Sequence, residues 1–386
     1  MSINWFPGHM VAASDKAKQA LAEHDVVIEV LDARCPGASG NPAIERMRMG
    51  RQRPALKVLN KTDIADPAAT AEWLKYFNGL KNTHAIAVSC KKPGEAAKVL
   101  SAARKLAPHR GGGADYTKPL RMLIMGVPNV GKSTLINALL KKRSAKVGDE
   151  PAVTKALARY DLGPGLWLTD TPGLMWPHIG NESDGLMLAA SHIIGANAYF
   201  ESEVAIYLAD LLIARYPQAV GTRYKVAARL AAISASAAGT AAGASAPGAT
   251  AGASALDATT ATTATSAPEA AAALATPVAP AEASPSGATI APATPGATAP
   301  AAASDGGLDG IALIETIARQ RGLRGKGEGN YDFDRAAIAL LADYRGGALG
   351  RITLETPQSR AAMLTAPKLK RANEEPEPEA APDEAA

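Results

Sequence analysis

The sequence predicts an α/β protein in which helices cover a parallel sheet that carries a phosphate-binding loop, followed by a smaller all-helical part. Three observations support this class. Short apolar runs alternate with helical periodicity through roughly the first 200 residues. A glycine-rich run at 126–133 stands between a predicted strand and a predicted helix. From residue 201 onward, the apolar residues repeat with helical spacing alone.

The predicted elements follow from these patterns in chain order. Apolar runs typical of buried strands occupy 26–31, 55–59, 85–89, 121–125 and 166–169. Amphipathic spacing predicts helices at 67–77, 95–106, 132–140, 201–230 and 308–344. The glycine triplet at 111–113 predicts a flexible linker over 109–118.

These elements divide the chain into four predicted segments. The first domain spans 1–200, and a second, helical domain combines 201–230 with 309–357. Between its halves, residues 231–308 are almost wholly Ala, Thr, Ser, Pro and Gly, a composition that forms no core and predicts a disordered insert. The fold tolerates such an insert, because closing a loop of this length costs only about 2 kcal/mol more than closing a short one. Residues 358–386 are predicted to be a disordered tail that is acidic at its end.

Charge is distributed unevenly along the chain. The 386 residues contain 41 Lys and Arg against 37 Asp and Glu, a net charge of +4. The insert and the last 15 residues contain no base and ten of the acids. The other 293 residues therefore carry 41 bases and 27 acids, a net charge of +14, which indicates an anionic partner such as nucleic acid.

The composition also excludes several classes of protein. No apolar run approaches the roughly 20 residues that a membrane-spanning helix requires, and residues 1–10 lack the hydrophobic core of a signal peptide. We therefore expect a cytoplasmic protein that has no membrane partner. Cys35 and Cys90 form no CxxC pair, so neither a disulfide framework nor a zinc site is indicated.

The run GVPNVGKS at 126–133 matches the phosphate-loop pattern GxxxxGK[ST] in the strand-to-helix context that the pattern requires. Its glycines let backbone N–H groups turn toward phosphate oxygens, and the following helix N-terminus adds positive potential. Lys132 is expected to reach the β and γ phosphates, which makes it a candidate catalytic residue, and Ser133 is expected to bind Mg²⁺. The candidate nucleotide-binding residues of the loop are Asn129, Val130, Gly131, Lys132, Ser133 and Thr134.

The run NKTD at 60–63 favours guanine over adenine. A carboxylate at Asp63 can accept hydrogen bonds from N1–H and the exocyclic amine of guanine, a donor pair that adenine lacks. We therefore predict that GTP is bound by Asn60, Lys61, Thr62 and Asp63. Ser89 ends another predicted strand and could back the guanine ring, although a plain turn explains it nearly as well.

The run DTPG at 170–173 follows the last predicted strand. Asp170 is expected to hold Mg²⁺ through water, and the backbone amide of Gly173 is expected to sense the γ phosphate. Thr154 is the candidate switch threonine for the same metal and a candidate catalytic residue. Ser133, Thr154 and Asp170 are thus the predicted Mg²⁺ ligands.

The order of the motifs is unusual. In an ordinary GTPase the phosphate loop comes first and the guanine motif comes late, whereas here the guanine motif starts 66 positions before the phosphate loop. The first domain is therefore predicted to be a circularly permuted P-loop GTPase domain. The permutation places the DTPG motif close before the helical domain, which gives the nucleotide state a short mechanical path to that domain.

With these motifs the sequence resembles the ribosome biogenesis GTPase A family over about residues 3–230 and 309–357. Beyond the nucleotide motifs, the resemblance is carried by WFPGHM at 5–10, VIEVLDAR at 27–34, DRAA at 334–337 and LGRITLE at 349–355. The sequence departs from the family at Ala152, where glycine is usual before the switch threonine, at Gly40, which replaces a basic residue, and in the insert.

The resemblance implies a monomeric enzyme that hydrolyses GTP with Mg²⁺ in late assembly of the large (50S) ribosomal subunit and is stimulated by that subunit. The implied partners are the large-subunit precursor and its rRNA. Leu174 stands where glutamine often positions the attacking water, and the resemblance points instead to His9, on the turn PGH at 7–9, although an exposed or RNA-contacting histidine is the alternative. Relatives with asparagine at position 129 use it to ligate K⁺, so Asn129 either binds K⁺ or only shapes the loop.

Basic residues alternate with glycines between two predicted helices of the second domain. They are Arg319, Arg321, Arg324 and Lys326. Together with the +14 charge of the foldable part, they are candidates for contact with rRNA phosphates, although such a run is often merely solvated. A different class of function stays open, namely an RNA-binding module that uses GTP to fix its shape and hydrolyses it incidentally.

Overall fold

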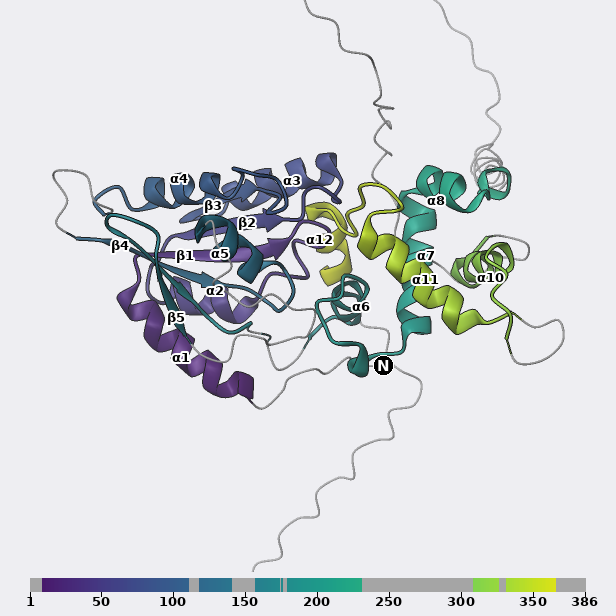
Figure 1. Ribbon diagram of the computed structural model, residues 1–386, viewed down its shortest axis with the longest axis horizontal. Coiled ribbons are helices and arrows are strands. Elements are labelled where there is room, and N and C mark those ends of the chain that lie inside the picture. The colour runs from purple at the N-terminus through teal and green to yellow at the C-terminus, as the bar shows by residue number, and fades with distance from the viewer. Residues whose placement is uncertain are drawn as a thin grey trace, which may run out of the picture. The chain divides into compact units, whose positions relative to one another are not determined.

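The computed structural model describes residues 9–110, 118–140, 157–173, 175, 179–230, 308–325 and 331–365, with side chains from residue 15 onward (Figure 1). The predicted insert, most of the predicted linker and the chain beyond residue 365 lie outside the described residues. The described residues confirm the predicted fold class, a largely parallel sheet with covering helices followed by a helical part.

Six strands form one sheet in the order β3-β2-β1-β4-β6-β5. Neighbouring strands are parallel except for β5 and β6, which are antiparallel. The strands are β1 (Val26–Asp32), β2 (Ala55–Asn60), β3 (Thr83–Ala87), β4 (Leu120–Met125), β5 (Ala158–Asp161) and β6 (Leu166–Asp170). The guanine motif follows β2 and the phosphate loop follows β4, so the domain is circularly permuted.

Two strands differ from the prediction. The sequence indicates no strand at β5, because its residues alternate between half-buried and exposed and form no apolar run. The strand predicted at 85–89 instead spans Thr83–Ala87. The chain leaves the sheet earlier because Ser89 turns into a loop, where its backbone N–H donates to Glu95 Oε2 at 2.7 Å.

Helices cover both faces of the sheet (Figure 1). Successive side chains of a strand point to opposite faces. Val27 of β1 therefore clusters with Leu21 and Ile44, and the next residue, Ile28, clusters with Val99 and Leu135 on the other face. These residues come from α1 (His9–Glu23), α2 (Pro42–Met49), α4 (Ala97–Leu106) and α5 (Lys132–Leu140). The sheet is also covered by α3 (Pro67–Asn78).

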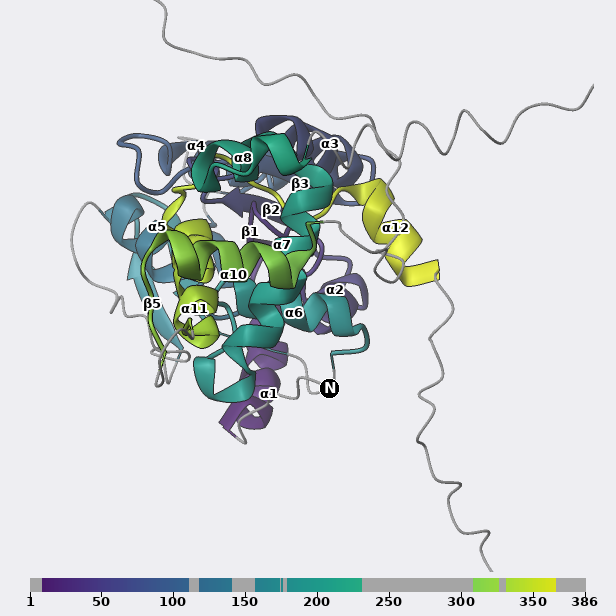
Figure 2. The same ribbon diagram turned by 90° about the vertical axis from the view of Figure 1, so that its right-hand side faces the viewer.

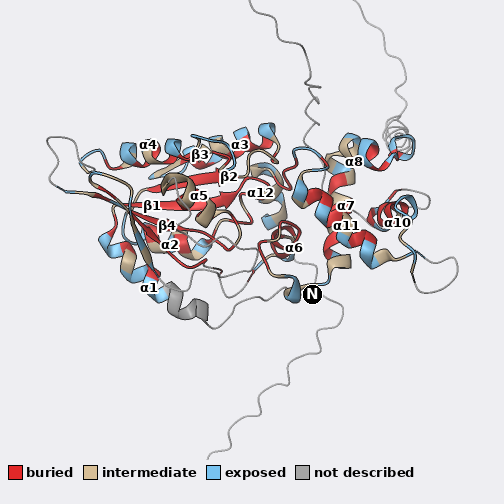
Figure 3. Ribbon diagram, viewed as in Figure 1, coloured by how far each residue is buried: buried red, intermediate tan, exposed pale blue. Residues whose placement is uncertain are grey.

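Helix α7 is the centre of the helical part, and α6, α8, α10 and α11 lie against it (Figures 1 and 2). These helices are α6 (Glu182–Ala190), α7 (Glu201–Arg215), α8 (Pro217–Tyr224), α10 (Gly310–Gln320) and α11 (Phe333–Gly346). Leu208 of α7 belongs to the same buried cluster as Ile314, Leu340 and Val30 of the sheet. Buried residues occur along both α7 and α11 (Figure 3). All described residues fall in one compact unit, and the domain boundary at residue 200 stays a prediction.

The prediction that the disordered tail starts at residue 358 was wrong, because helix α12 (Pro357–Thr365) occupies the beginning of that segment. Thr356 caps this helix: the Ser359 backbone N–H donates to Thr356 Oγ1 at 3.1 Å, and the Thr356 backbone N–H donates to Ser359 Oγ at 2.8 Å. Arg360 then pairs with Asp184 of α6 at 2.8 Å. The composition of the tail could not reveal this partner, because the two residues are far apart in the chain.

His24, directly after α1, joins that helix to the sheet. Its Nε2 lies 2.8 Å from Thr169 Oγ1 of β6, and its Nδ1 lies 2.5 Å from the Ala20 carbonyl oxygen. A neutral ring with its proton on Nδ1 donates to the carbonyl and accepts from the hydroxyl. Burial lowers the pKa of His24 below its ordinary value, although the Ala20 carbonyl opposes the shift. The fold therefore favours the neutral form.

His24→Gln is expected to reduce the loss of stability on acidification. Because the folded pKa lies below the ordinary value of 6.5, the unfolded chain binds the proton first, and the fold loses stability as the pH falls through that value. Urea denaturation should show wild type more stable by about 1 kcal/mol near neutral pH, from the better hydrogen bonds of the ring, and a smaller difference near pH 5. His109→Gln, at an exposed position, should leave the profile unchanged. Identical pH profiles for wild type and His24→Gln would contradict the prediction.

Candidate nucleotide-binding site

The motif residues meet at one edge of the sheet, because parallel strands bring their carboxyl ends together. Strand β1 ends at Asp32, β2 at Asn60 and β6 at Asp170, and Gly126 follows β4. The register pairs Asp32 with Asn60 and Ile124 with Asp170. The strand order reverses between β1 and β4, which is where open α/β sheets bind ligands.

The phosphate loop passes close over β1. Gly126 and Gly131 have φ of +146° and +99°, conformations that residues with a Cβ rarely adopt. A Cβ on Gly126 would also lie 2.6 Å from the Val30 carbonyl oxygen. The path of the loop therefore requires glycine at this position.

Lys132 lies buried beneath the phosphate loop at the first position of α5. Its Nζ donates to the carbonyl oxygens of Gly126 at 3.1 Å and Val127 at 3.0 Å. Burial lowers the pKa of Lys132 to about 8, and the charge of Asp170 opposes part of this shift. The ammonium group is thus held against the loop on the side of the Asp170 carboxylate.

The guanine motif is bonded directly to the phosphate loop. Asn60 Nδ2 donates to the Val130 carbonyl at 2.8 Å, and Lys61 Nζ donates to the Asn129 carbonyl at 2.8 Å. Asn60 Nδ2 also occupies the space that a Cβ on Gly131 would need. The tertiary fold thus brings together two motifs that are 66 positions apart in the chain.

Three residues with positive φ form a chain of hydrogen bonds across the site. They are Lys61 at +66°, Asn129 at +56° and His192 at +59°. Lys61 donates to the Asn129 carbonyl, and Asn129 Nδ2 donates to the His192 carbonyl at 2.9 Å. Such conformations are costly for residues with a side chain and persist where surrounding contacts enforce them.

Asp63 lies beside Ser89. The Ser89 hydroxyl donates to Asp63 Oδ1 at 2.8 Å, and Lys91 Nζ lies 3.4 Å from Asp63 Oδ2. Burial raises the pKa of Asp63, but the hydroxyl and the lysine outweigh burial and hold it below the ordinary value. Asp63 is therefore an ionised acceptor whose carboxylate is oriented by Ser89.

A buried ion pair beneath the site is a feature that the nucleotide motifs do not indicate. Arg34 Nε and Nη2 donate to the two carboxylate oxygens of Asp32 at 2.9 and 2.8 Å. Lys61 Nζ lies 2.8 Å from Asp32 Oδ2. Burial raises the pKa of Asp32, but Arg34 and Lys61 outweigh burial and hold it far below the usual range. The only sequence signal was the acid–base spacing in DAR at 32–34.

The DTPG segment packs on the phosphate loop. Asp170 is buried at the end of β6, and the Thr171 hydroxyl donates to the Ile124 carbonyl at 2.9 Å. A Cβ on Gly173 would lie 3.0 to 3.2 Å from atoms of Pro128 in the loop. A displacement of the DTPG segment therefore requires the phosphate loop to move as well, and the reverse also holds.

The carbonyl groups at the end of α6 are bound by several separate segments. Arg345 of α11 donates to the carbonyls of Ala189 and Ala190, both at 2.9 Å. Arg34 donates to the Ser191 carbonyl at 3.0 Å, and Asn129 of the phosphate loop donates to the His192 carbonyl. The last carbonyls of a helix have no partner within it, so these side chains connect α6 to both the nucleotide site and α11.

The predicted basic run begins in the last turn of α10, where Arg319 lies, and continues toward α11. Arg319 and Arg324 are exposed. Arg321 and Arg223 both pair with Asp343 of α11, so the charge of Arg321 is partly neutralised. Arg319 pairs with Glu315 at 3.7 Å, but both side chains are more than half exposed and such a pair contributes little, so Arg319 and Arg324 are better placed than Arg321 to meet an anionic partner.

Several predicted site residues lie outside the described part of the chain. They are Thr154, Lys326 and the side chain of His9. The backbone of His9 begins α1 instead of lying in a turn, because the alanine-rich residues that follow favour helix. Within the described ranges, no three His, Cys, Asp or Glu residues are grouped to hold a metal, and no helix has the length and apolar character needed to cross a bilayer.

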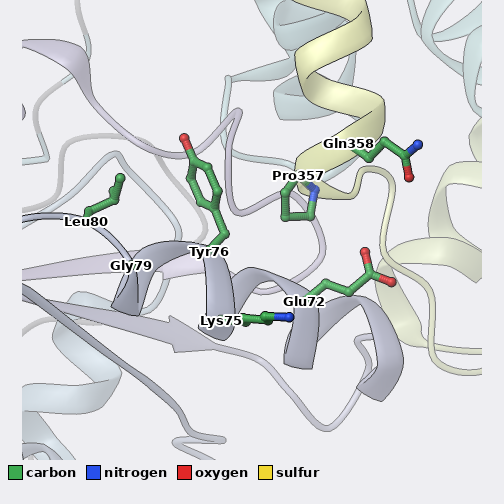
Figure 4. Close-up of a pocket in the computed structure, with 7 residues that line it drawn as sticks. All are labelled: Glu72, Lys75, Tyr76, Gly79, Leu80, Pro357 and Gln358. Atoms are coloured by element: carbon green, nitrogen blue, oxygen red, sulfur yellow. The ribbon is translucent and has the colours of Figure 1, made fainter.

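A groove of about 510 Å³ lies between α3 and the start of α12 (Figure 4). Its lining residues are Glu72, Lys75, Tyr76, Gly79, Leu80, Pro357 and Gln358. None of these residues belongs to a nucleotide motif, so the groove is separate from the nucleotide site.

Comparison with known proteins identifies ribosome-related GTPases among the proteins similar to this chain. A family model described as 50S ribosome-binding GTPase matches residues 121–231. Ribosome biogenesis GTPase A of Priestia megaterium is 36% identical over 231 residues, covering 58% of this chain and 79% of the relative. The protein of the same name from Bacillus cereus is 39% identical, covering 58% and 77%. Short integuments 2, a mitochondrial protein of Arabidopsis thaliana, is 32% identical, covering 54% and 56%.

A solved structure, the GDP-bound form of TM YlqF, has a similar fold. It covers 89% of this chain and 99% of its own length with a TM-score of 0.50 and 20% sequence identity. At this identity the likeness shows the fold alone.

Lys61→Met is expected to weaken the binding of guanine nucleotides about tenfold, because it removes a charged hydrogen bond of the kind that contributes about 1.5–3 kcal/mol. The substitution separates the guanine motif from Asn129 and leaves Asp32 with Arg34 alone. Titration with a fluorescent GDP analogue measures the change. Lys98→Met is the control, since the Lys98 side chain on α4 is 61% exposed and such surface pairs contribute little. Equal effects of the two substitutions would contradict the prediction.

Proposed function

The chain belongs to the ribosome biogenesis GTPase A family, and from this membership we propose that it acts in late assembly of the large (50S) ribosomal subunit, which stimulates its hydrolysis of GTP. The chain is a GTPase of ribosome assembly. The structural observation that best supports the GTP-binding part of this proposal is the direct bonding of the guanine motif to the phosphate loop through Asn60 and Lys61.

We assign the guanine base to Asp63, with Ser89 orienting its carboxylate and Thr62 completing the loop. Asn60 and Lys61 align this loop with the phosphate loop. The phosphates are assigned to Asn129, Val130, Gly131, Lys132, Ser133 and Thr134, and the γ phosphate also to the Gly173 amide. Contact between Gly173 and Pro128 supports the last assignment, because it places the DTPG segment against the phosphate loop.

Ser133 and Asp170 have the chemistry that Mg²⁺ requires, since this ion prefers oxygen ligands and keeps several waters. Ser133 lies in the first turn of α5, and Asp170 ends β6, the strand beside β4. Thr154 is proposed as the further ligand. When bound, the ion neutralises charge on the phosphates. We also propose K⁺ as a second cation ligated by Asn129, whose amide nitrogen is oriented by the His192 carbonyl.

The contacts at the end of α6 support the proposal that the state of the nucleotide is transmitted to the helical domain. The DTPG segment packs on the phosphate loop at one end of this route, and α6 follows it in the chain. Arg345 of α11 binds the last carbonyls of α6 at the other end. We propose that hydrolysis displaces α6, alters the docking surface of the helical domain and so releases the protein from the subunit.

The proposed partner of the helical domain, 201–230 with 309–357, is rRNA of the large-subunit precursor. The foldable part of the chain carries a net charge of +14. Arg319 and Arg324 are exposed and suited to phosphate contact, and Arg321 and Lys326 are proposed as further contacts. We propose that the protein works as a monomer in the cytoplasm.

His9→Ala is expected to preserve GTP binding and to lower subunit-stimulated turnover about 100-fold, as expected for loss of a group that positions or polarises the attacking water. Phosphate release with and without large subunits measures the turnover, and a fluorescent analogue measures binding. His109→Ala serves as the control at an exposed position. Unchanged stimulated turnover in His9→Ala would remove His9 from this role.

The protein is expected to sediment with large ribosomal subunits in a non-hydrolysable GTP analogue, and less so when the salt concentration is raised, because phosphate contacts release counterions. The double variant Arg319→Ala and Arg324→Ala should reduce this co-sedimentation, and Lys98→Ala, exposed on α4, should not. Absence of salt-sensitive co-sedimentation would contradict the ribosomal role. Co-sedimentation without stimulated turnover would favour an RNA-binding module with incidental hydrolysis.

A further inference from the structure

The segment LGRITLE at 349–355, which the nucleotide motifs do not include, lies against the guanine-recognition loop. Arg351 makes the first contacts. Its Nη2 donates to the Thr62 carbonyl at 2.8 Å, and its Nε donates to the Ala65 carbonyl at 2.9 Å. One guanidinium group therefore bridges both sides of the turn that carries Asp63.

The two residues after Arg351 continue this pairing. The Ile352 backbone N–H donates to the Ile64 carbonyl at 3.0 Å. The Asp66 backbone N–H donates to Thr353 Oγ1 at 3.0 Å, and that hydroxyl donates to the Ala33 carbonyl at 3.1 Å. The segment thus binds the backbone of the loop on both sides of Asp63.

The same segment is held on its far side by buried contacts. Residues 352–355 are all buried. The Thr353 backbone N–H donates to Tyr216 Oη at 3.1 Å, and the Leu354 carbonyl accepts from Arg215 Nη1 at 2.6 Å. The Trp73 indole N–H donates to the Glu355 carbonyl at 2.9 Å. The backbone that carries Arg351 is therefore held in place by the buried residues that follow it.

Asp63 itself has few constraints on its side chain. Its carboxylate accepts a hydrogen bond from the Ser89 hydroxyl, and the Lys91 ammonium group, 3.4 Å from the other carboxylate oxygen, belongs to a largely exposed side chain. Ser89 orients the carboxylate, and the backbone of residues 62–66, whose carbonyls Arg351 and Ile352 bind, sets the position from which the side chain extends.

We propose that Arg351 is a positioning residue for guanine recognition, acting through the backbone on either side of Asp63. This inference rests on the proposed role of Asp63 as acceptor for guanine. An aspartate that is misdirected loses the paired hydrogen bonds to N1–H and the 2-amino group while the phosphate contacts remain. Arg351 thereby affects the choice of base more than the overall strength of nucleotide binding.

The test compares GDP with inosine diphosphate, which lacks only the 2-amino group. Dissociation constants are measured by competition with a fluorescent GDP analogue for wild type, Arg351→Ala, Arg351→Lys and Arg335→Ala. Wild type should prefer GDP. Arg351→Ala should lower GDP affinity about 25-fold, the equivalent of two hydrogen bonds, and inosine diphosphate affinity about fivefold, the equivalent of the N1–H bond alone.

The conservative variant and the control separate positioning from general stability. Arg351→Lys reaches only one carbonyl at a time and should show an intermediate loss of preference for GDP. Arg335→Ala, at an exposed position on α11, should match wild type. If Arg351→Ala does not fold, as judged by its thermal unfolding, the lysine variant decides the outcome.

Two results would overturn the inference while leaving the guanine role of Asp63 intact. One is an equal loss of affinity for both nucleotides, and the other is an unchanged preference for GDP in both Arg351 variants. A wild-type protein that binds the two nucleotides equally would instead refute the role of Asp63 and the inference with it. Asp63→Asn should abolish the preference if that role is correct.

Discussion

The carboxylate of Asp32, at the end of β1, has no exposed surface and binds two cations from different parts of the chain. A buried charge that lost its partners would cost several kcal/mol, so the pairing fixes where those partners lie. Lys61 reaches from Asp32 to the phosphate loop and aligns the guanine motif with it. Arg34 reaches from the same carboxylate to the Ser191 carbonyl at the end of α6. The relative positions of the guanine loop, phosphate loop and α6 depend on this ion pair.

Circular permutation changes what the nucleotide site is attached to. The DTPG segment leads through α6 into the helical part instead of returning into the sheet. The helical part contacts the surroundings of the site at two places. Arg345 of α11 binds carbonyls at the end of α6, and the segment at 349–355 lies beside the guanine loop. The phosphate side and the base side of the site are therefore each in contact with the helical part.

The motifs, five of the strands and the helices α3, α4 and α5 could be read from the sequence because they depend on local patterns, whereas α1, α2 and α6 were not predicted. Apolar runs of the right length mark buried strands, and GVPNVGKS has a required loop geometry of its own. Patterns failed where a partner distant in the chain decides the structure. Strand β5 lacks an apolar run because it is an edge strand, and α12 depends on a cap and on the pairing of Arg360 with Asp184.

The sequence by itself determined the class of fold, the permuted order of motifs and the motif residues that are candidates for binding a guanine nucleotide. Each of these follows from residue type and spacing along the chain, which local chemistry controls. Only the tertiary structure decided how those residues are held. The bonds of Asn60 and Lys61 to the phosphate loop, and of Arg351 to the loop of Asp63, join residues about 70 and 290 positions apart. No local pattern encodes such pairs, because their proximity arises from the order and direction of strands in the sheet.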